Sequence, residues 1–130
     1  TDDGAFTDRC NCMMLAALPG RVGDGGSKTI TNTAANGATS TQTTLVGAAA
    51  TSASLRRFLV GPLECEITGV DTTPDGRTVF VGIQHPGEDA TDPNAPTSNW
   101  PANQNAAAPG VRPRSSVVAV TRQDGGIIGL

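Results

Sequence analysis

Large apolar side chains are gathered in a few short runs of this chain, and long polar stretches separate them. The first run covers residues 13–18, and two longer apolar regions cover residues 55–85 and 116–130. Between them, residues 20–54 and 86–115 hold few large apolar side chains. The pattern therefore predicts short buried strands in the two longer apolar regions, and two long polar excursions over the surface.

Three strands are predicted in the first of the longer apolar regions. They cover residues 55–60, 64–70 and 77–84. The sequence Thr73-Pro74-Asp75-Gly76 between the second and the third is a hairpin turn signal, because proline presets φ and glycine accepts a positive φ. We therefore expect these two strands to pair as a hairpin.

Another strand is predicted over residues 116–121. A turn at residues 123–126 follows it, and Ile127-Ile128 is expected to begin a further strand. Consecutive antiparallel strands form a meander, which is the unit of a β-sandwich or of one β-propeller blade. The predicted fold class is therefore all-β, with long irregular loops. A helix over residues 45–59 is the competing local prediction, because its first half is rich in alanine.

Composition limits the size of the core and excludes several classes of protein. Leu, Ile, Val and Phe make up 25 of the 130 residues, so the chain is a marginal domain or part of a larger one. No apolar run approaches the roughly 18 residues of a membrane span. The first residues do not resemble a secretion signal. A net charge of −3 with nine scattered Lys and Arg argues against a nucleic-acid-binding surface.

The three cysteines leave two interpretations open. An odd number with one Cys-x-Cys pair, Cys10 and Cys12, is not a disulfide framework. Buried free thiols are one interpretation, and a bridge from Cys65 to either of the other two is the alternative. Four-ligand zinc would need more Cys or His than a chain with a single histidine offers.

Two carboxylates stand close together at the start of the second predicted strand. Side chains alternate along a strand, so Glu64, Glu66 and Thr68 are expected on one face and Cys65 and Ile67 on the other. Two neighbouring carboxylates repel each other unless a cation or a basic group lies between them, and hard cations such as Ca²⁺ bind oxygen ligands of this kind. A solvated edge strand is the alternative interpretation.

A second group of polar side chains follows the third predicted strand. The sequence Gln84-His85-Pro86-Gly87-Glu88 brings an amide, an imidazole and a carboxylate to the point where the strand gives way to a turn. Sites on β scaffolds often lie at strand ends. The alternative is an ordinary turn in which His85 bonds to backbone.

These segments together resemble the C-terminal signature of the PhoX-type alkaline phosphatases. The resemblance rests on Cys65-Glu66-Ile67-Thr68-Gly69, Thr73-Pro74-Asp75-Gly76-Arg77-Thr78, Phe80-Val81 and Gln84-His85-Pro86-Gly87-Glu88. Residues 55–62 and 112–129 extend it on either side. It covers residues 55–130 well, 1–18 moderately and 20–54 poorly.

The resemblance implies one or two blades of a β-propeller whose central channel holds calcium and iron ions and hydrolyses phosphomonoesters. Residues 1–130 would be a C-terminal fragment, with 20–54 as a polar surface insertion and 55–130 as the blade region. Glu66 matches the family glutamate that binds the metal cluster, and Glu64, His85 and Glu88 are further candidates. The resemblance assigns no catalytic residue here. It also implies export, so the expected location is periplasmic or secreted.

One departure from the family pattern supports a second hypothesis. The phosphatases have a phosphate-contacting arginine just before this glutamate, whereas Pro62-Leu63-Glu64-Cys65 contains none. An acidic Glu64 would repel a phosphate that a bidentate arginine would hold. A non-catalytic propeller that serves binding or structure is therefore the alternative.

Two expectations concern the isolated chain. It is expected to be inactive towards a phosphomonoester substrate, because most of the metal cage would be missing. It is also expected to self-associate, since an isolated blade exposes strand edges that pair readily with another copy.

Overall fold

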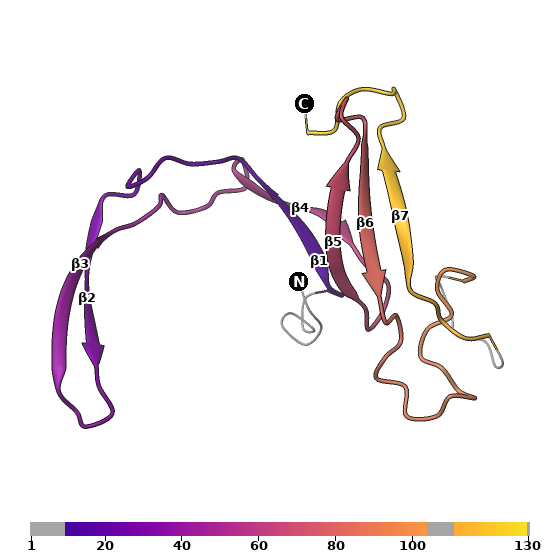
Figure 1. Cartoon of the computed structure of the whole chain (residues 1–130), viewed down its shortest axis with the longest axis horizontal. Helices are drawn as coiled ribbons and strands as arrows, with labels where there is room; N and C mark the ends of the chain where they lie inside the picture. Colours follow the sequence, from indigo (N-terminus) through magenta and orange to yellow (C-terminus); the bar gives the residue numbers. More distant parts are fainter. Residues whose placement is uncertain (1–9, 104–110, 130) are drawn as a thin grey trace. The chain divides into compact units, whose positions relative to one another are not determined.

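The computed structural model describes residues 10–103 and 111–129, and these contain seven strands and no helix (Figure 1). The strands are β1 (Met13–Ala17), β2 (Ser27–Thr33), β3 (Thr39–Leu45), β4 (Leu55–Val60), β5 (Glu66–Thr72), β6 (Thr78–Gln84) and β7 (Ser116–Thr121). The predicted all-β class is confirmed. The predicted strands at 55–60 and 116–121 are confirmed with these bounds, whereas the competing helix over 45–59 is wrong, because 52–54 form a turn that leads into β4.

The strands form three sheets, which pair β1 with β4, β2 with β3, and β5-β6-β7 in that order. The chain divides into two compact units. The hairpin unit is Leu15–Arg56, and the meander unit comprises Thr1–Met14 and Arg57–Leu130. The described part of the chain contains no helix long and apolar enough to cross a membrane.

The three-stranded sheet is an antiparallel meander with its core on one face. Val79, Val81 and Ile83 alternate along β6 and are buried, because successive side chains of a strand point to opposite faces. The buried apolar cluster of this unit consists of Cys12, Cys65, Val79, Val81, Ile83 and Trp100. On the opposite face, Phe80 is 39% exposed and Val117 is 70% exposed. The meander therefore carries apolar side chains on both faces.

The turn between β5 and β6 has the predicted chemistry. Gly76 adopts a φ of +67°, and its N–H donates to the Thr73 carbonyl at 2.8 Å. The Asp75 carboxylate accepts bonds from the Thr73 hydroxyl at 2.6 Å and from the Arg77 N–H at 3.1 Å. These hydrogen bonds, with a smaller contribution from the Arg77 charge, lower the pKa of Asp75. The predicted hairpin is confirmed.

The segment after β7 differs from the prediction. Ile127 and Ile128 do not begin a strand, since Ile128 lies in a turn and its N–H donates to the Gly76 carbonyl at 3.0 Å. The Ile128 side chain packs against the buried cluster. Folding this segment back onto the β5–β6 turn covers an apolar side chain without a further strand.

The hairpin unit contains regular structure that the apolar pattern did not predict. Strands β2 and β3 pair over seven residues without a register shift. Gly37 closes the hairpin with a φ of +82°, and its N–H donates to the Ala34 carbonyl at 2.9 Å. The expected surface location of this segment agrees with the exposure of its strands, which contain no buried residue.

All three cysteines are free thiols, which agrees with the first of the two interpretations. Cys65 is fully buried and Cys12 is 9% exposed. Burial, together with the neighbouring Cys12, raises the pKa of Cys65 to about 11. A Cβ placed on Gly61 would lie 2.4 Å from the Cys65 Sγ, so this glycine leaves room for the thiol.

Candidate functional site

The predicted site residues converge at the end of the meander where β5 begins and β6 ends. Glu66, the first residue of β5, lies directly opposite Gln84, the last residue of β6. Just beyond the strands, the Gly87 N–H donates to the Leu63 carbonyl at 3.0 Å, and the Glu88 N–H donates to the Glu64 carbonyl at 3.4 Å. The two sequence segments that we singled out are therefore hydrogen-bonded to each other.

Glu64 does not lie on the strand as predicted. It belongs to a turn with a φ of +51°, and its carboxylate accepts a hydrogen bond from the Thr97 hydroxyl. The β5–β6 register also shifts between Ile67 and Val70. The regular alternation that we expected through Glu64, Glu66 and Thr68 is therefore wrong, because the bonds to the 87–88 segment hold the chain in a turn before β5 begins.

His85 is exposed and lies in the loop after β6. Its φ is +50°, and its backbone N–H donates to the Ser115 hydroxyl at 3.1 Å. Its ring Nε2 is 2.7 Å from the Gln84 Nε2, so the two side chains are hydrogen-bonded to each other. The ring is thus bonded to a side chain, whereas the ordinary-turn interpretation expected a bond to backbone.

Gly87 fixes the course of this loop. Its φ is +75°, and a Cβ at this position would lie 3.0 Å from the Ser98 Cβ and 3.1 Å from the Ser98 N. Both the conformation and the close approach favour glycine. The backbone between His85 and Glu88 is therefore held by contacts with segments from three parts of the chain.

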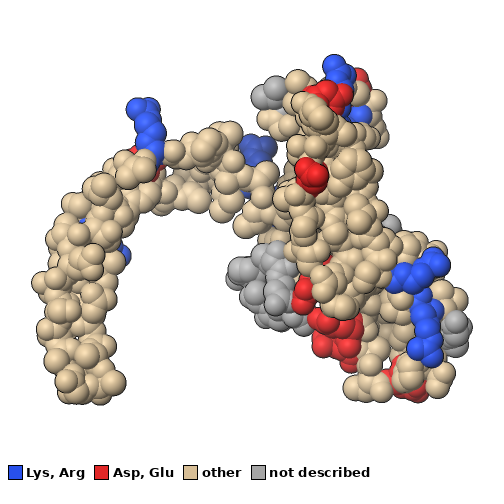
Figure 2. Space-filling view, viewed as in Figure 1, with Lys and Arg blue, Asp and Glu red and all other residues tan. Residues whose placement is uncertain are grey.

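Glu66 is the candidate metal ligand that the resemblance singled out, and its surroundings are those of the first residue of β5. It is half-buried, and its carboxylate makes no hydrogen bond or ion pair within the described part of the chain. Acidic side chains gather at this end of the meander (Figure 2). The acidic residues of the two segments are Glu64, Glu66, Glu88 and Asp89.

The described residues do not form a complete metal site by themselves. No group of three or more His, Cys, Asp or Glu side chains among residues 10–103 and 111–129 is arranged to hold an ion. Calcium takes about six to eight oxygen ligands. Glu66 thus fits a metal centre as one contributed ligand, and the remaining ligands would have to come from elsewhere.

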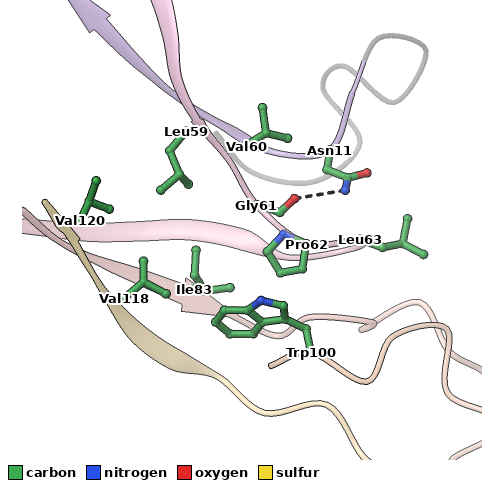
Figure 3. Close-up of a pocket in the computed structure, with 10 residues that line it drawn as sticks. All are labelled: Asn11, Leu59, Val60, Gly61, Pro62, Leu63, Ile83, Trp100, Val118 and Val120. Atoms are coloured by element: carbon green, nitrogen blue, oxygen red, sulfur yellow. Dashed lines mark hydrogen bonds between the residues drawn. The ribbon is translucent and has the colours of Figure 1, made fainter. Parts of the chain in front are cut away.

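A separate apolar pocket of about 390 Å³ lies in the meander unit (Figure 3). Its lining residues are Asn11, Leu59, Val60, Gly61, Pro62, Leu63, Ile83, Trp100, Val118 and Val120. The Asn11 amide donates to the Gly61 carbonyl at 3.1 Å at its rim. None of these described lining residues is charged, so the pocket does not suit a phosphate group.

Trp100 is the residue of this region that the sequence analysis missed. It is 7% exposed and belongs to the buried cluster, although it comes from the polar segment 86–115. The signal was present in the sequence, because the chain has a single tryptophan and it stands between polar residues and a proline. A large aromatic side chain in such a segment usually marks the point where a loop folds back onto a core.

Comparison with known proteins assigns the family. The family described as alkaline phosphatase PhoX matches residues 20–87, which is more than half of the chain. A solved structure of PhoX from Pseudomonas fluorescens, in complex with vanadate as a transition state analogue, is 37% identical and covers 87% of this chain, with a TM-score of 0.48. No curated protein matched. The chain belongs to the PhoX alkaline phosphatase family, and the predicted family is confirmed.

The matches cover only part of this chain and a small part of its relative. The chain spans 19% of the length of the Pseudomonas fluorescens PhoX chain. The family match includes Glu64, Glu66 and His85 and ends before Glu88. It also includes residues 20–54, the segment in which we expected the poorest resemblance. Residues 20–56 of the hairpin unit are therefore within the region that the family model matches.

Proposed function

We propose that this chain is the C-terminal part of a PhoX-like metal-dependent phosphatase that hydrolyses phosphomonoesters when complete. Glu66 is proposed as one ligand of the calcium and iron cluster of the whole protein. Metal ions of this kind stabilise the charge on the phosphoryl oxygens and supply an activated oxygen nucleophile. The observation that carries the proposal is the half-buried Glu66 carboxylate, which has no partner among the described residues, at the acidic end of the meander.

Three further residues have supporting roles in this proposal. Glu64 and Glu88 belong to the two turns that are bonded to each other, so they order the loops around Glu66. His85 is held by Gln84 and Ser115, so it too is placed to order the loop. In this proposal these residues position Glu66, and we expect the isolated chain to be inactive.

The apolar faces of the meander support its role as a propeller blade. A sheet with a buried cluster on one face and Phe80 and Val117 exposed on the other has a second surface to bury. A blade lies between two neighbours and buries both faces. Export to the periplasm or the cell exterior belongs to the same proposal, since it rests on the family.

The first test uses the full-length parent protein and an aryl phosphate substrate with Ca²⁺ and Fe³⁺. Replacement of Glu66 by Gln keeps the size and hydrogen-bonding capacity of the side chain but removes its charge. We expect a loss of kcat of at least about 100-fold, together with loss of bound metal measured by elemental analysis.

The matched control is Asp71→Asn on the same strand. Asp71 is exposed, and its carboxylate accepts a bond from the adjacent Thr72 N–H at 2.8 Å, at the opposite end of β5 from Glu66. This variant should keep both metal content and activity. If Glu66→Gln retained the metal content and kcat of the control, the assignment of Glu66 would be wrong.

A non-catalytic propeller that binds or scaffolds is the second candidate function. It is favoured by the segment Pro62-Leu63-Glu64-Cys65, which contains no arginine and in which Glu64 is bonded to Thr97. Elemental analysis of the full-length protein discriminates between the two functions. Iron and calcium together support the phosphatase, whereas a folded protein without either supports the scaffold.

A further inference from the structure

The tip of the β2–β3 hairpin contains the single Asn-Gly pair of the sequence, Asn36-Gly37. Both residues are exposed, and a Cβ placed on Gly37 would meet no atom within 4 Å. The two strands that lead to this tip contain no buried residue (Figure 1). The peptide bond between Asn36 and Gly37 is therefore open to water within the hairpin unit.

The Asn36 side chain is folded over this peptide bond. Its Oδ1 accepts a hydrogen bond from the Ala38 N–H at 3.0 Å, which is the bond that asparagine side chains make to the backbone two residues on. The side-chain carbon Cγ and the Gly37 nitrogen thus belong to one short hydrogen-bonded ring. A donor on Oδ1 also stabilises the negative charge that this oxygen acquires if Cγ is attacked by a nucleophile.

One backbone contact opposes an attack by the Gly37 nitrogen on Cγ. The Gly37 N–H donates to the Ala34 carbonyl at 2.9 Å, so this bond has to open before the nitrogen can react. A two-stranded hairpin is marginally stable in water, and segments with few buried apolar contacts open locally at low cost in free energy. The contact therefore slows the attack without preventing it.

The other asparagines lack this combination, since glycine follows none of them. Asn94 is exposed like Asn36, but alanine follows it. Asn32 lies within the β2–β3 ladder and threonine follows it, and Asn99 is 1% exposed. A Cβ on the following residue shields its backbone nitrogen, whereas glycine has no Cβ. Exposure and the following residue therefore set Asn36 apart.

We propose that Asn36 is a site of spontaneous deamidation, at which the folded protein converts an asparagine into aspartate and isoaspartate. Hydroxide removes the Gly37 amide proton, and the nitrogen attacks Cγ of Asn36 to close a succinimide ring. The bond from Cγ to Nδ2 breaks, and Nδ2 leaves as ammonia with a proton from water, which regenerates hydroxide. Water then opens the ring at either carbonyl. The net reaction consumes water, releases ammonia and needs no oxidant, and it does not depend on the proposed phosphatase activity.

Either product changes the hairpin tip. Residues 33–39 contain no charged side chain, so the new carboxylate is the first charge at this turn. Isoaspartate also routes the main chain through Cγ, which lengthens the turn by one carbon atom. The Gly37 bond to the Ala34 carbonyl then loses its geometry, so the Gly37 amide of the isoaspartate form should exchange with solvent faster than that of the unmodified protein.

The test uses the folded full-length parent protein, kept in a mildly alkaline buffer and sampled by peptide mapping with mass spectrometry. This measurement detects the mass gained when an NH₂ group is replaced by OH, and chromatography separates the aspartate and isoaspartate peptides. We expect conversion of Asn36 at least about ten-fold faster than that of Asn94, the exposed asparagine followed by alanine.

The matched variant is Gly37→Ala, which places a Cβ beside the attacking nitrogen. It should slow the conversion of Asn36 about ten-fold and leave that of Asn94 unchanged. Gly37 has a φ of +82°, so alanine there also strains the turn. Strain would loosen the tip and speed the reaction, so a slower reaction is due to the added Cβ.

The same protein in urea shows how far the fold protects the site. We expect the folded protein to convert Asn36 within about ten-fold of the rate of the unfolded protein, because the tip opens easily. Equal rates at Asn36 and Asn94 in the folded protein would overturn the proposal. So would an unchanged rate in Gly37→Ala, or a conversion of Asn36 that occurs only in urea.

Discussion

The meander and the β2–β3 hairpin both consist of antiparallel strands, but only the meander strands bury side chains. Strand β6 holds three buried apolar residues, whereas β2 and β3 hold none. Both regions satisfy their backbone hydrogen bonds over similar lengths, since each ladder joins strands of six or seven residues. The difference shows that strand pairing in this chain does not require a core. A core is instead needed for independent stability, because apolar burial is the dominant favourable term in folding.

The comparison also separates two kinds of unsatisfied surface. The meander exposes apolar side chains on its second face, Phe80 and Val117 among them, so it suits a partner sheet that packs face to face. The hairpin exposes polar side chains and backbone edges, so it suits a partner strand that pairs edge to edge. The two regions therefore predict different modes of association from the same fold.

The largest expected effect on the free energy of unfolding comes from replacing an isoleucine by alanine, and this replacement is compared between the two regions. Ile83 on β6 is 3% exposed and Ile30 on β2 is 43% exposed. Ile83→Ala should lower the free energy of unfolding by about 2–5 kcal/mol, because it removes buried methyl groups and leaves a cavity. Ile30→Ala should change it by about 0.5 kcal/mol or less. Urea unfolding followed by circular dichroism measures both, and equal losses would contradict the contrast.

The second largest expected effect is a loss of folding stability at alkaline pH, and its source is a thiol of the meander unit. The folded-state pKa of Cys65 is about 11 against an ordinary value of 9.0, so the thiol stays protonated in the folded chain after it has ionised in the unfolded one. The stability that depends on it is fully present below pH 9 and is lost as the pH rises towards 11. Two pKa units correspond to about 2–3 kcal/mol.

Urea midpoints measured across this pH window test the assignment to Cys65. The Cys65→Ala variant should be less stable at pH 8, because it leaves a small cavity, yet it should lose less stability between pH 9 and 11. The hairpin unit contains no cysteine and offers no such group. An alkaline loss of the same size in the variant would assign the effect to other groups.

The smallest expected effect is a loss of stability at acidic pH, and one aspartate from each region contributes to it. The pKa of Asp75 is lowered by the bonds from Thr73 and Arg77, and that of Asp24 by bonds from the backbone N–H groups of Arg21 and Ala48. Their stabilising contributions are present above pH 3.8 and are lost as the pH falls through the lowered values. Replacement by Asn should therefore weaken the acid sensitivity of each turn.

Both aspartates are exposed, so each change should be modest. Carboxyl titration by NMR measures the two pKa values directly. The Asp75→Asn change should also appear in the acid dependence of global unfolding, whereas Asp24→Asn should alter only the exchange of local amides such as that of Ala48. A global effect from Asp24 alone would mean that the hairpin unit unfolds together with the core.

The sequence predicted the apolar strands well and the polar strands poorly. Strands β4 and β7 and the β5–β6 turn follow from apolar runs and turn chemistry, which are local signals. Strands β2 and β3 were missed because their exposed residues leave no apolar alternation to detect. The threonines, which favour strands, and the Asn36-Gly37 pair, which favours a tight hairpin, were the signals available.

The candidate site was predicted in its members and only partly in its geometry. Glu66, Glu64, His85 and Glu88 were all singled out, and the structure brings their segments together at one end of the meander. The placement of Glu64 on the strand was wrong, because its turn depends on hydrogen bonds to a segment more than twenty residues away. Spacing along a strand cannot include such a contact.

The sequence by itself determined the strands over residues 55–60 and 116–121 and the turn between β5 and β6. These features follow from short apolar runs and from the φ preferences of proline and glycine, which act over a few residues. Only the tertiary structure decided that β1 pairs with β4, that Trp100 folds back onto the core, and that the Glu66 carboxylate has no partner among residues 10–103 and 111–129. These features depend on residues far apart in the chain, whose contacts form only when the whole unit folds.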